Sequence, residues 1–473
     1  MKNCKKIFAI VLAVALVLAL GITAYAATVT KTEGVEGPAS ITVTLPAIPE
    51  GYTANNTYKI YKVFDAQLAE GSDGISYTLT GSHTTPPDGF TVDDAGNVSY
   101  AGTSTDGSLT ETDIAAIKAY VTEADLVATV ETTIADSSFT VDNLPYGYYY
   151  ITTTTGTVVT VDSTHPNAEV NDKNEIPPVD KKITGATSYD ADGKKAIAEV
   201  GSVVEFEASI VKKNGAENYI FHDTMSTGLA YNNDVVVTVN GQPVSAGSAT
   251  YTIGADVGDT FTVRFANEYI ETLADETKIV FTYTATVTSD ALQLDPANNT
   301  ASLDFGDVNG ENHTPPVVVE VYNAKISVYK TDDEDEPLAN AEFVLKNSND
   351  KYYSKDADGK IVWVDSIEDA EVHISDAEGN VPAFTGLANG TYTLVETKAP
   401  AGYNKGADVQ FTINEHDYTA ENLIKSATVI NKEGPELPST GGIGTTIFYV
   451  LGGLLVFAAA VVLIARRRAS VNA

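Results

Sequence analysis

The sequence is poor in the residues that build disulfides and metal centres. Its 473 residues include one cysteine, Cys4, near the N-terminus, and only six histidines. The histidines show no spacing typical of a metal site, and no Ser/His/Asp or Cys/His set is apparent. We therefore expect no enzymatic activity toward other molecules, no metal and no cofactor.

Basic residues are also scarce. The chain has 29 Lys and Arg residues against 64 Asp and Glu residues, a formal net charge of −35. So acidic a surface repels phosphate backbones and anionic lipid headgroups. This balance argues against nucleic acid or a membrane surface as a partner and favours a soluble surface structure.

The N-terminus has the composition of an export signal. Lys2, Lys5 and Lys6 precede an apolar stretch at residues 7–20, and Ala24-Tyr25-Ala26 has the small residues of a cleavage site. We expect residues 1–26 to be removed; a membrane span is disfavoured because the apolar stretch is short. Removal takes away the cysteine, so the exported chain must be stabilised without disulfides.

The C-terminus has the pattern of a membrane anchor. Residues 445–465 carry no charge, and at ~1.5 Å rise per residue they match the roughly 30 Å hydrocarbon core of a bilayer. The three arginines at 466–468 favour a cytoplasmic C-terminus. Everything before the anchor is then outside the cell, and the chain contacts the membrane only transiently through this helix.

Five residues ahead of the span resemble the sorting signal of Gram-positive surface proteins, which sortase transpeptidases read. They are Leu437, Pro438, Ser439, Thr440 and Gly441. Pro438 bends an extended peptide, and Gly441 leaves the preceding bond uncrowded. The resemblance implies cleavage between Thr440 and Gly441 and transfer of the Thr440 carbonyl to an amine. An ordinary anchor after a Pro/Gly linker is the alternative.

Most of the chain between these ends has the pattern of β-strands. Alternating or β-branched runs, such as residues 41–45 and 235–239, are separated by Asp, Gly and Asn turns. One further helix is predicted from Thr110 to about Ala128, because Thr110 and Asp113 form a capping pair. We predict an all-β chain of tandem immunoglobulin-like β-sandwiches, with helices at the signal and the transmembrane anchor.

Turns and linkers divide this β-rich region. The Asp-Ala-Asp-Gly segments at 190–193 and 356–359 resemble calcium loops but lack the other ligands of an EF-hand, so they are predicted to be hairpin turns. Pro-bearing linkers stand at 174–178 and 313–316. The predicted boundaries are 1–26 for the signal, 27–173, 174–322 and 323–432 for three domains, and 433–473 for the sorting region.

Three polar residues of the third domain fall on the inward side of predicted strands. Lys330 shares one face with Ile326 and Val328, and the same counting turns Glu396 and Asn431 inward. Burial lowers a lysine pKa and raises a carboxyl pKa, so amine and acid could both be neutral. A neutral amine could attack the asparagine amide and release ammonia, with the acid moving protons. A buried ion pair beside an asparagine is the alternative, and periodicity alone slightly favours it.

The third domain resembles the collagen-adhesin B-type module of SpaA-type pilins. Three segments carry the resemblance: KTD at 330–332, PLANAEF at 337–343 and YTLVETKAPAGY at 392–403. It implies a spontaneous isopeptide bond between Lys330 and Asn431, with Glu396 as the catalyst. Asn340 stands where the family usually has glycine, and residues 348–382 exceed a minimal module.

The second domain poses a choice between two adjacent lysines. Lys181 shares a face with Ile183, which favours it as the buried lysine and Lys182 as the solvated one. Asp223 and Asn299 also occupy inward positions of alternating runs. For Asp223, a cap or turn role is the alternative.

This region, from residue 178 to about 322, resembles the isopeptide-forming second domain of fimbrial backbone proteins. The landmarks are VDKKI at 179–183, HDTM at 222–225 and NTA at 299–301. The resemblance implies a bond from Lys181 to Asn299, with Asp223 as the acid. The bond would join the first and last strands of the domain.

The first domain is less informative. Residues 58–65 are apolar on both faces, so periodicity cannot choose a buried lysine; because some related pilins also link this domain, Lys62 with Asn174 is a candidate pair. Family pilins polymerise through the lysine of a Tyr-Pro-Lys-Asn segment between the first two domains. Here the sequence keeps only Lys-Asn, which makes Lys173 the candidate and an ordinary surface lysine the equal alternative.

Together these resemblances imply the major subunit of a covalently polymerised, cell wall-anchored pilus on a Gram-positive surface. The implied partners are sortase, other pilin subunits and the peptidoglycan of the cell wall. The alternative is a wall-anchored adhesin or ancillary pilin that binds a host ligand.

Overall fold

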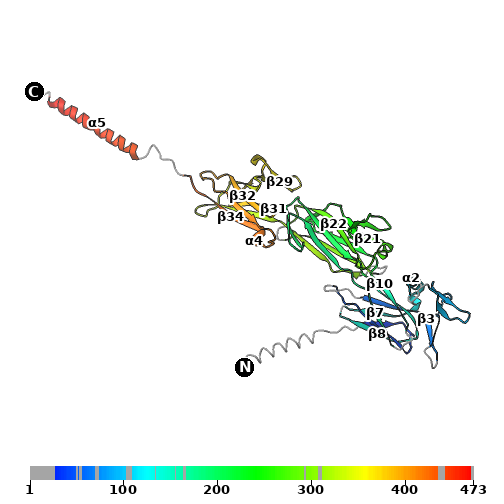
Figure 1. Ribbon diagram of the computed structural model, residues 1–473. Helices are drawn as coiled ribbons and strands as arrows, with labels where there is room; N and C mark the ends of the chain where they lie inside the picture. Colours follow the sequence, from blue (N-terminus) through cyan, green and yellow to red (C-terminus); the bar gives the residue numbers. More distant parts are fainter. Residues whose placement is uncertain are drawn as a thin grey trace, which may run out of the picture.

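The computed structural model describes residues 27–434 and 443–469, apart from 49–51, 53–55, 70–73, 82, 103–108, 134, 155, 163–166, 292–294 and 307–311. The strands of this part form six sheets, arranged as three consecutive two-sheet units along an elongated molecule (Figure 1). The helix α5 (Ile443–Ala469) stands apart at the C-terminal end. The prediction of an all-β chain with a C-terminal helix is confirmed, whereas the predicted signal lies outside the described residues.

The first unit pairs an eight-stranded sheet with a three-stranded sheet. The large sheet contains β1 (Thr28–Lys31), β3 (Asn56–Leu68), β4 (Ile75–Leu79), β5 (Phe90–Val92), β6 (Val98–Tyr100), β7 (Leu126–Thr132), β9 (Gly147–Thr153) and β10 (Gly156–Asp162). The small sheet contains β2 (Ala39–Thr44), β8 (Ser138–Leu144) and β11 (Asn167–Asn171). An apolar core that includes Ile41, Tyr58 and Val141 fills the space between them.

The predicted helix of this unit is present but shorter than expected. The helix α2 (Glu111–Tyr120) starts after Thr110, whose side chain and that of Asp113 form the expected capping box. The predicted end near Ala128 is wrong. The chain becomes extended after α2, makes a second capping box around the short 3₁₀ helix η1 (Glu123–Asp125) and enters β7.

The second unit packs a six-stranded sheet on an eight-stranded sheet. The six-stranded sheet contains β12 (Val179–Gly185), β15 (Val203–Val211), β17 (Leu229–Tyr231), β18 (Val236–Val239), β19 (Gln242–Pro243) and β22 (Lys278–Val287). The eight-stranded sheet contains β13 (Ser188–Tyr189), β14 (Lys195–Ile197), β16 (Ile220–Met225), β20 (Tyr251–Gly254), β21 (Phe261–Phe265), β23 (Ala297–Phe305), β24 (Asn312–His313) and β25 (Val317–Tyr322). A short helix, α3 (Asn267–Glu271), follows β21.

The third unit is smaller. Its three-stranded sheet contains β26 (Ala324–Asp332), β31 (Asn380–Leu387) and β34 (Ile424–Asn431), and β26 pairs in parallel with β34. Its six-stranded sheet contains β27 (Glu342–Asn347), β28 (Tyr352–Lys355), β29 (Ile361–Val364), β30 (His373–Ile374), β32 (Gly390–Lys398) and β33 (Val409–Ile413). Two short helices, η2 (Ile367–Asp369) and α4 (Ala420–Leu423), complete the unit.

The two Asp-Ala-Asp-Gly segments are hairpin turns, as predicted. Asp190 Oδ1 accepts hydrogen bonds from the backbone N–H groups of Lys194 and Lys195. Asp356 Oδ1 does the same for Asp358 and Lys360. Each first aspartate therefore uses its side chain to close its own turn.

The segment that exceeds a minimal module joins the third unit to the second. It contributes β28 and β29, and Trp363 Nε1 on β29 donates a 2.9 Å hydrogen bond to Glu199 Oε2. The backbone of Val200 also bonds to Ile361 and to Gly386. The extra length is thus used for contacts between the two units.

Candidate isopeptide centres

Two lysines stand out by burial. Among the described residues, Lys181 and Lys330 are the lysines counted as buried, and each is 0% exposed. Each lies in a unit that also buries an acid and an asparagine at the positions expected from the sequence. A fully buried ammonium is unfavourable unless it is compensated, so both places call for a chemical explanation.

In the second unit the buried groups come from both sheets. Lys181 stands on β12 of the six-stranded sheet, whereas Asp223 on β16 and Asn299 on β23 belong to the eight-stranded sheet. Lys181 Nζ donates a hydrogen bond to Asp223 Oδ2 between the sheets. The prediction that Asn299 lies on the last strand of the domain is wrong, because β24 and β25 follow β23 and extend the same sheet.

A fourth residue, Tyr283 on β22, lies at the middle of this centre. Its hydroxyl donates to Asp223 Oδ2, accepts from Lys181 Nζ, and lies 3.4 Å from Asn299 Nδ2, which donates to it. Sequence reasoning did not identify Tyr283. The only signal was its inward position on the alternating strand β22, where an aromatic residue is indistinguishable from core packing.

Burial shifts the protonation of this group toward neutral forms. It lowers the pKa of Lys181 to about 8, even though Asp223 opposes the shift. It also raises the pKa of Asp223 above its usual range despite the lysine. The rings of Phe206 and Tyr283 lie 5.8 Å and 5.1 Å from Lys181 Nζ and help to exclude water. Burial therefore favours the neutral amine and the protonated acid.

The third unit arranges the same residue types differently. Lys330 on β26 donates to the carbonyl oxygens of Thr331 at 2.7 Å and Val429 at 3.0 Å. Asn431, on the adjacent parallel strand β34, donates from Nδ2 to Glu396 Oε1 at 2.8 Å. Glu396 reaches this contact from β32 in the facing sheet. Burial lowers the pKa of Lys330, so the neutral amine is favoured here as well.

Two details of the third unit are set by local backbone. Gly406 N–H donates to Glu396 Oε2 at 2.5 Å, and a Cβ on Gly406 would lie only 2.9 Å from Asn431 Oδ1. A glycine is therefore needed for the backbone to cover this centre, which sequence reasoning did not anticipate. Asn340, which replaces the usual glycine, has φ of +65°, a conformation that asparagine tolerates better than most residues.

The lysine and asparagine suggested for the first unit have other partners. Lys62 Nζ forms an ion pair with Asp65 at 2.6 Å. The backbone N–H of Asn174 donates to Asp172, and its side chain lies against Gly215 of the second unit. Lys173 is exposed in the linker between β11 and β12.

The described part of the anchor agrees with the predicted span. Within α5, the stretch Ile447–Arg467 contains an 18-residue window with a mean hydropathy of 2.8, and none of this window is buried against the rest of the chain. The predicted sorting residues Leu437, Pro438, Ser439, Thr440 and Gly441 lie outside the described residues.

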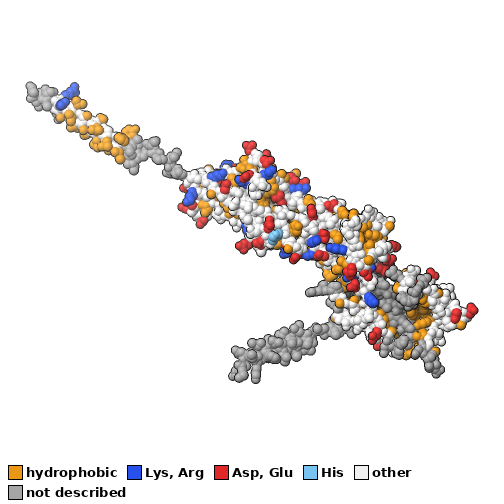
Figure 2. All heavy atoms as spheres, in the orientation of Figure 1, with side chains coloured by type: hydrophobic (Ala, Val, Ile, Leu, Met, Phe, Trp, Pro, Cys, Tyr) orange, Lys and Arg blue, Asp and Glu red, His pale blue; other side chains and the backbone are white. Residues whose placement is uncertain are grey.

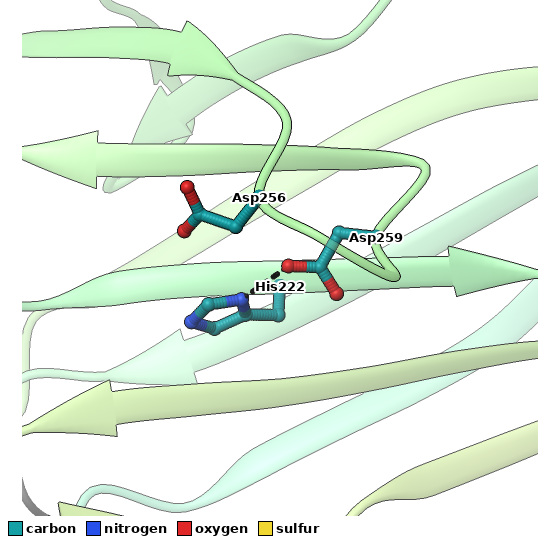
Figure 3. A group of neighbouring side chains, drawn as sticks. All are labelled: His222, Asp256 and Asp259. Atoms are coloured by element: carbon teal, nitrogen blue, oxygen red, sulfur yellow. Dashed lines mark hydrogen bonds and ion pairs between the residues drawn. The ribbon is translucent and has the colours of Figure 1, made fainter.

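One group of side chains has the composition of a metal site. His222, Asp256 and Asp259 bring ligand atoms within 4.8 Å of one another (Figure 3). However, both imidazole nitrogens already face carboxylates, Nδ1 with Asp259 at 2.7 Å and Nε2 with Asp304 at 3.1 Å. Although burial alone would lower it, these two partners raise the pKa of His222 to about 9. The group is therefore assigned as an imidazolium held between carboxylates.

Comparisons with known proteins agree with this organisation. Residues 324–427 match the SpaA prealbumin-like fold domain, and residues 430–471 match the LPXTG cell wall anchor motif. The fimbrial subunit type 2 of Actinomyces naeslundii is 27% identical over 395 residues, covering 70% of this chain and 72% of that protein.

Two solved structures of pilus backbone proteins are similar to the chain, and the first shows the same fold. The T6 backbone pilin of serotype M6 Streptococcus pyogenes superposes with a TM-score of 0.55 at 16% identity, over 80% of this chain and 81% of the pilin. The pilus 2b backbone protein of group B streptococcus is 26% identical, with a TM-score of 0.45 over 55% of this chain and 99% of that protein. The chain is a cell wall-anchored protein of the Gram-positive surface, with a SpaA-type domain directly before an LPXTG anchor and similarity to a fimbrial subunit over most of its length.

Proposed function

We propose that this chain is the backbone subunit of a sortase-assembled pilus, stiffened by two internal Lys–Asn isopeptide bonds. The observation that carries the proposal is the presence of two buried Lys–acid–Asn groups in consecutive units ahead of an LPXTG anchor. The similarity to a fimbrial subunit and to backbone pilins supports the same conclusion. The role is structural, and the chain's own chemistry is limited to these links.

Each link follows from burial of a neutral amine beside an amide. The lone pair of Nζ attacks Cγ of the asparagine, the bond from Cγ to Nδ2 breaks, and ammonia leaves with the proton lost by the amine. A protonated carboxyl assists by polarising the amide and moving protons. Lys181 with Asn299 and Lys330 with Asn431 supply the two reacting pairs.

The links would replace disulfides in a chain that lacks them. Lys181 to Asn299 closes a loop of about 120 residues and Lys330 to Asn431 one of about 100, each worth about 5 kcal/mol by the chain-entropy argument used for disulfides. A pull on the polymer would then pass through covalent bonds inside the second and third units, so the strands that these bonds bridge need not separate.

Polymerisation would join the sorting signal of one subunit to an exposed lysine of the next. Sortase would cleave after Thr440 and transfer its carbonyl to an exposed amine of the next subunit. Lys173 is exposed between the first two units and is not part of either buried centre, which suits a transfer site. The last subunit would be passed to a peptidoglycan amine.

The test is the size of the protein released from the cell wall. Wild-type cells should give a ladder of SDS-resistant species on an immunoblot, and Lys173→Arg should collapse the ladder to the monomer. Lys405→Arg, at another exposed lysine, should leave the ladder intact. A single band in the wild type would contradict the backbone role and favour an adhesin anchored as a monomer. A ladder that persists in Lys173→Arg would assign the linkage to another lysine.

A further inference from the structure

The two centres differ in how the acid meets the reacting nitrogens. In the third unit Glu396 contacts the amide nitrogen of Asn431 directly. In the second unit Asp223 contacts the amine of Lys181, and the recorded contact of Asn299 Nδ2 is with the hydroxyl of Tyr283. Tyr283 is therefore the group that touches both the nitrogen that must lose a proton and the nitrogen that must gain one.

We propose that Tyr283 is a catalytic residue of the second unit, whose hydroxyl relays a proton from Lys181 Nζ to the departing Nδ2 of Asn299. The inference rests on the proposed Lys181–Asn299 link. It assigns to Tyr283 the transfer of a proton between the two reacting nitrogens, a step that the lysine, aspartate and asparagine do not provide.

The relay balances without any added reagent. Once Nζ has attacked Cγ, the new secondary ammonium gives a proton to the Tyr283 oxygen, and Tyr283 gives its own proton to Nδ2. Nδ2 then leaves as ammonia, and the phenol is restored. Asp223, hydrogen-bonded to the same hydroxyl, supports the transfer while its protonated form polarises the amide.

The surroundings of Tyr283 suit this role. Burial raises the pKa of Tyr283 well above 10, so the residue remains a phenol that can both give and accept a proton. Its ring is held by Phe206 at 5.7 Å and by Phe261 at 5.0 Å between ring centroids. The side chain is 3% exposed, which keeps water from bypassing the relay.

The test is the rate of link formation in Tyr283→Phe, which keeps the ring and removes the hydroxyl. The full chain is made by cell-free synthesis with detergent, and cross-linked peptides are quantified by mass spectrometry over time. We expect the Lys181–Asn299 link to form about 100-fold more slowly, the usual size of an acid–base contribution. The Lys330–Asn431 link in the same molecule should form at the wild-type rate. Tyr231→Phe, a neighbouring tyrosine that bonds to the Val235 backbone, is the matched control.

The outcomes separate this inference from the function on which it rests. Absence of both links in the wild type overturns the proposed chemistry as a whole. A wild-type link that forms equally fast in Tyr283→Phe overturns the relay alone. A second measurement uses the wild type in D₂O and needs no mutation. Formation of the Lys181–Asn299 link should slow more than formation of the Lys330–Asn431 link, because the Tyr283 relay moves two protons in one step. Equal slowing would also overturn the relay.

Discussion

The centres of the second and third units use the same three residue types in different geometries. In the second unit the lysine stands on one sheet and the asparagine on the other, so a bond between them would fasten the two layers of the sandwich together. In the third unit both residues stand on neighbouring parallel strands of one sheet, β26 and β34. There the bond would reinforce an existing ladder of hydrogen bonds.

The polar contacts differ as well. The amine of Lys181 is held by an acid and a phenol, whereas that of Lys330 is held by two backbone carbonyls. What the two centres share is burial, which removes water and lowers the pKa of both lysines. For the proposed links, desolvation is therefore the common requirement, and the two centres offer different groups to carry the protons.

The largest expected effect comes from removing each lysine. Lys181→Met and Lys330→Met should each lose one link and retain the other, which the intact mass would show as one ammonia lost where the wild type loses two. Loss of either link should lower the free energy of unfolding by about 5 kcal/mol, because a long loop is no longer closed in the unfolded state. Urea unfolding measures this change.

Lys182→Met is the control for these variants, because Lys182 precedes Ile183 on the outer face of β12 and pairs with Glu207 at 3.1 Å. It should keep both links and most of the stability. If both Lys181→Met and Lys330→Met keep the wild-type free energy of unfolding, the links are absent or do not stabilise the protein.

Removing the acids should separate the proton paths of the two centres. Glu396→Gln and Asp223→Asn are each expected to slow their own link by about 100- to 10,000-fold. The loss should be larger in the third unit, because Glu396 is the side chain that contacts the departing nitrogen, whereas Asp223→Asn leaves Tyr283 in place. Time courses of cross-linked peptides measure both rates. A larger loss in Asp223→Asn would reverse the assignment of proton paths.

The imidazolium of His222 lies on the opposite face of β16 from Asp223 and makes the second unit sensitive to pH. Its pKa is raised to about 9, so its stabilising effect is complete below about 6.5 and is lost as pH rises through 9. A rise in pKa from 6.5 to about 9 corresponds to roughly 3–4 kcal/mol, at about 1.36 kcal/mol per pH unit. The hydrogen-exchange protection factors of β16 and β21, which are corrected for the intrinsic base-catalysed exchange rate, should fall between pH 6.5 and 9, and His222→Gln should flatten this response. An unchanged response in His222→Gln would contradict the ion-pair assignment.

Much of the two centres could be predicted from alternation alone. A strand places every second residue on one face, so counting from Ile326 turned Lys330 inward, and counting from Ile183 separated Lys181 from Lys182. The predicted end of α2 was wrong because a capping pair marks only where a helix starts. The residues after Tyr120 leave the helix and lead into the alternating strand β7, which the helical spacing did not reveal.

Other parts of the centres leave no distinctive signal in the sequence. Tyr283 occupies an apolar position of β22 that any large residue could fill, and its contacts depend on packing between two sheets. Gly406 lies in a loop, and its closeness to Asn431 arises only when the chain folds back over β34. The Lys62–Asn174 pairing was suggested only because some related pilins link this domain, whereas the structure gives Lys62 the local partner Asp65.

The smallest expected effect, and the most direct probe of burial, is the pH dependence of link formation in the second unit. The amine reacts only when neutral, and its pKa of about 8 means that its neutral fraction rises about tenfold per pH unit below that value. Asp223 acts in its protonated form, so its raised pKa must keep a protonated fraction over the same range, and the rate should fall again at higher pH. Synthesis of the chain between pH 6 and 9, followed by quantification of the Lys181–Asn299 peptide pair, should give a bell-shaped profile. A solvent-exposed lysine would instead give a rate that still climbs toward pH 10. That outcome would show that water reaches Lys181 before the link forms. Desolvation would then not be required for link formation even in the second unit, where the lysine is 0% exposed and its pKa is lowered to about 8.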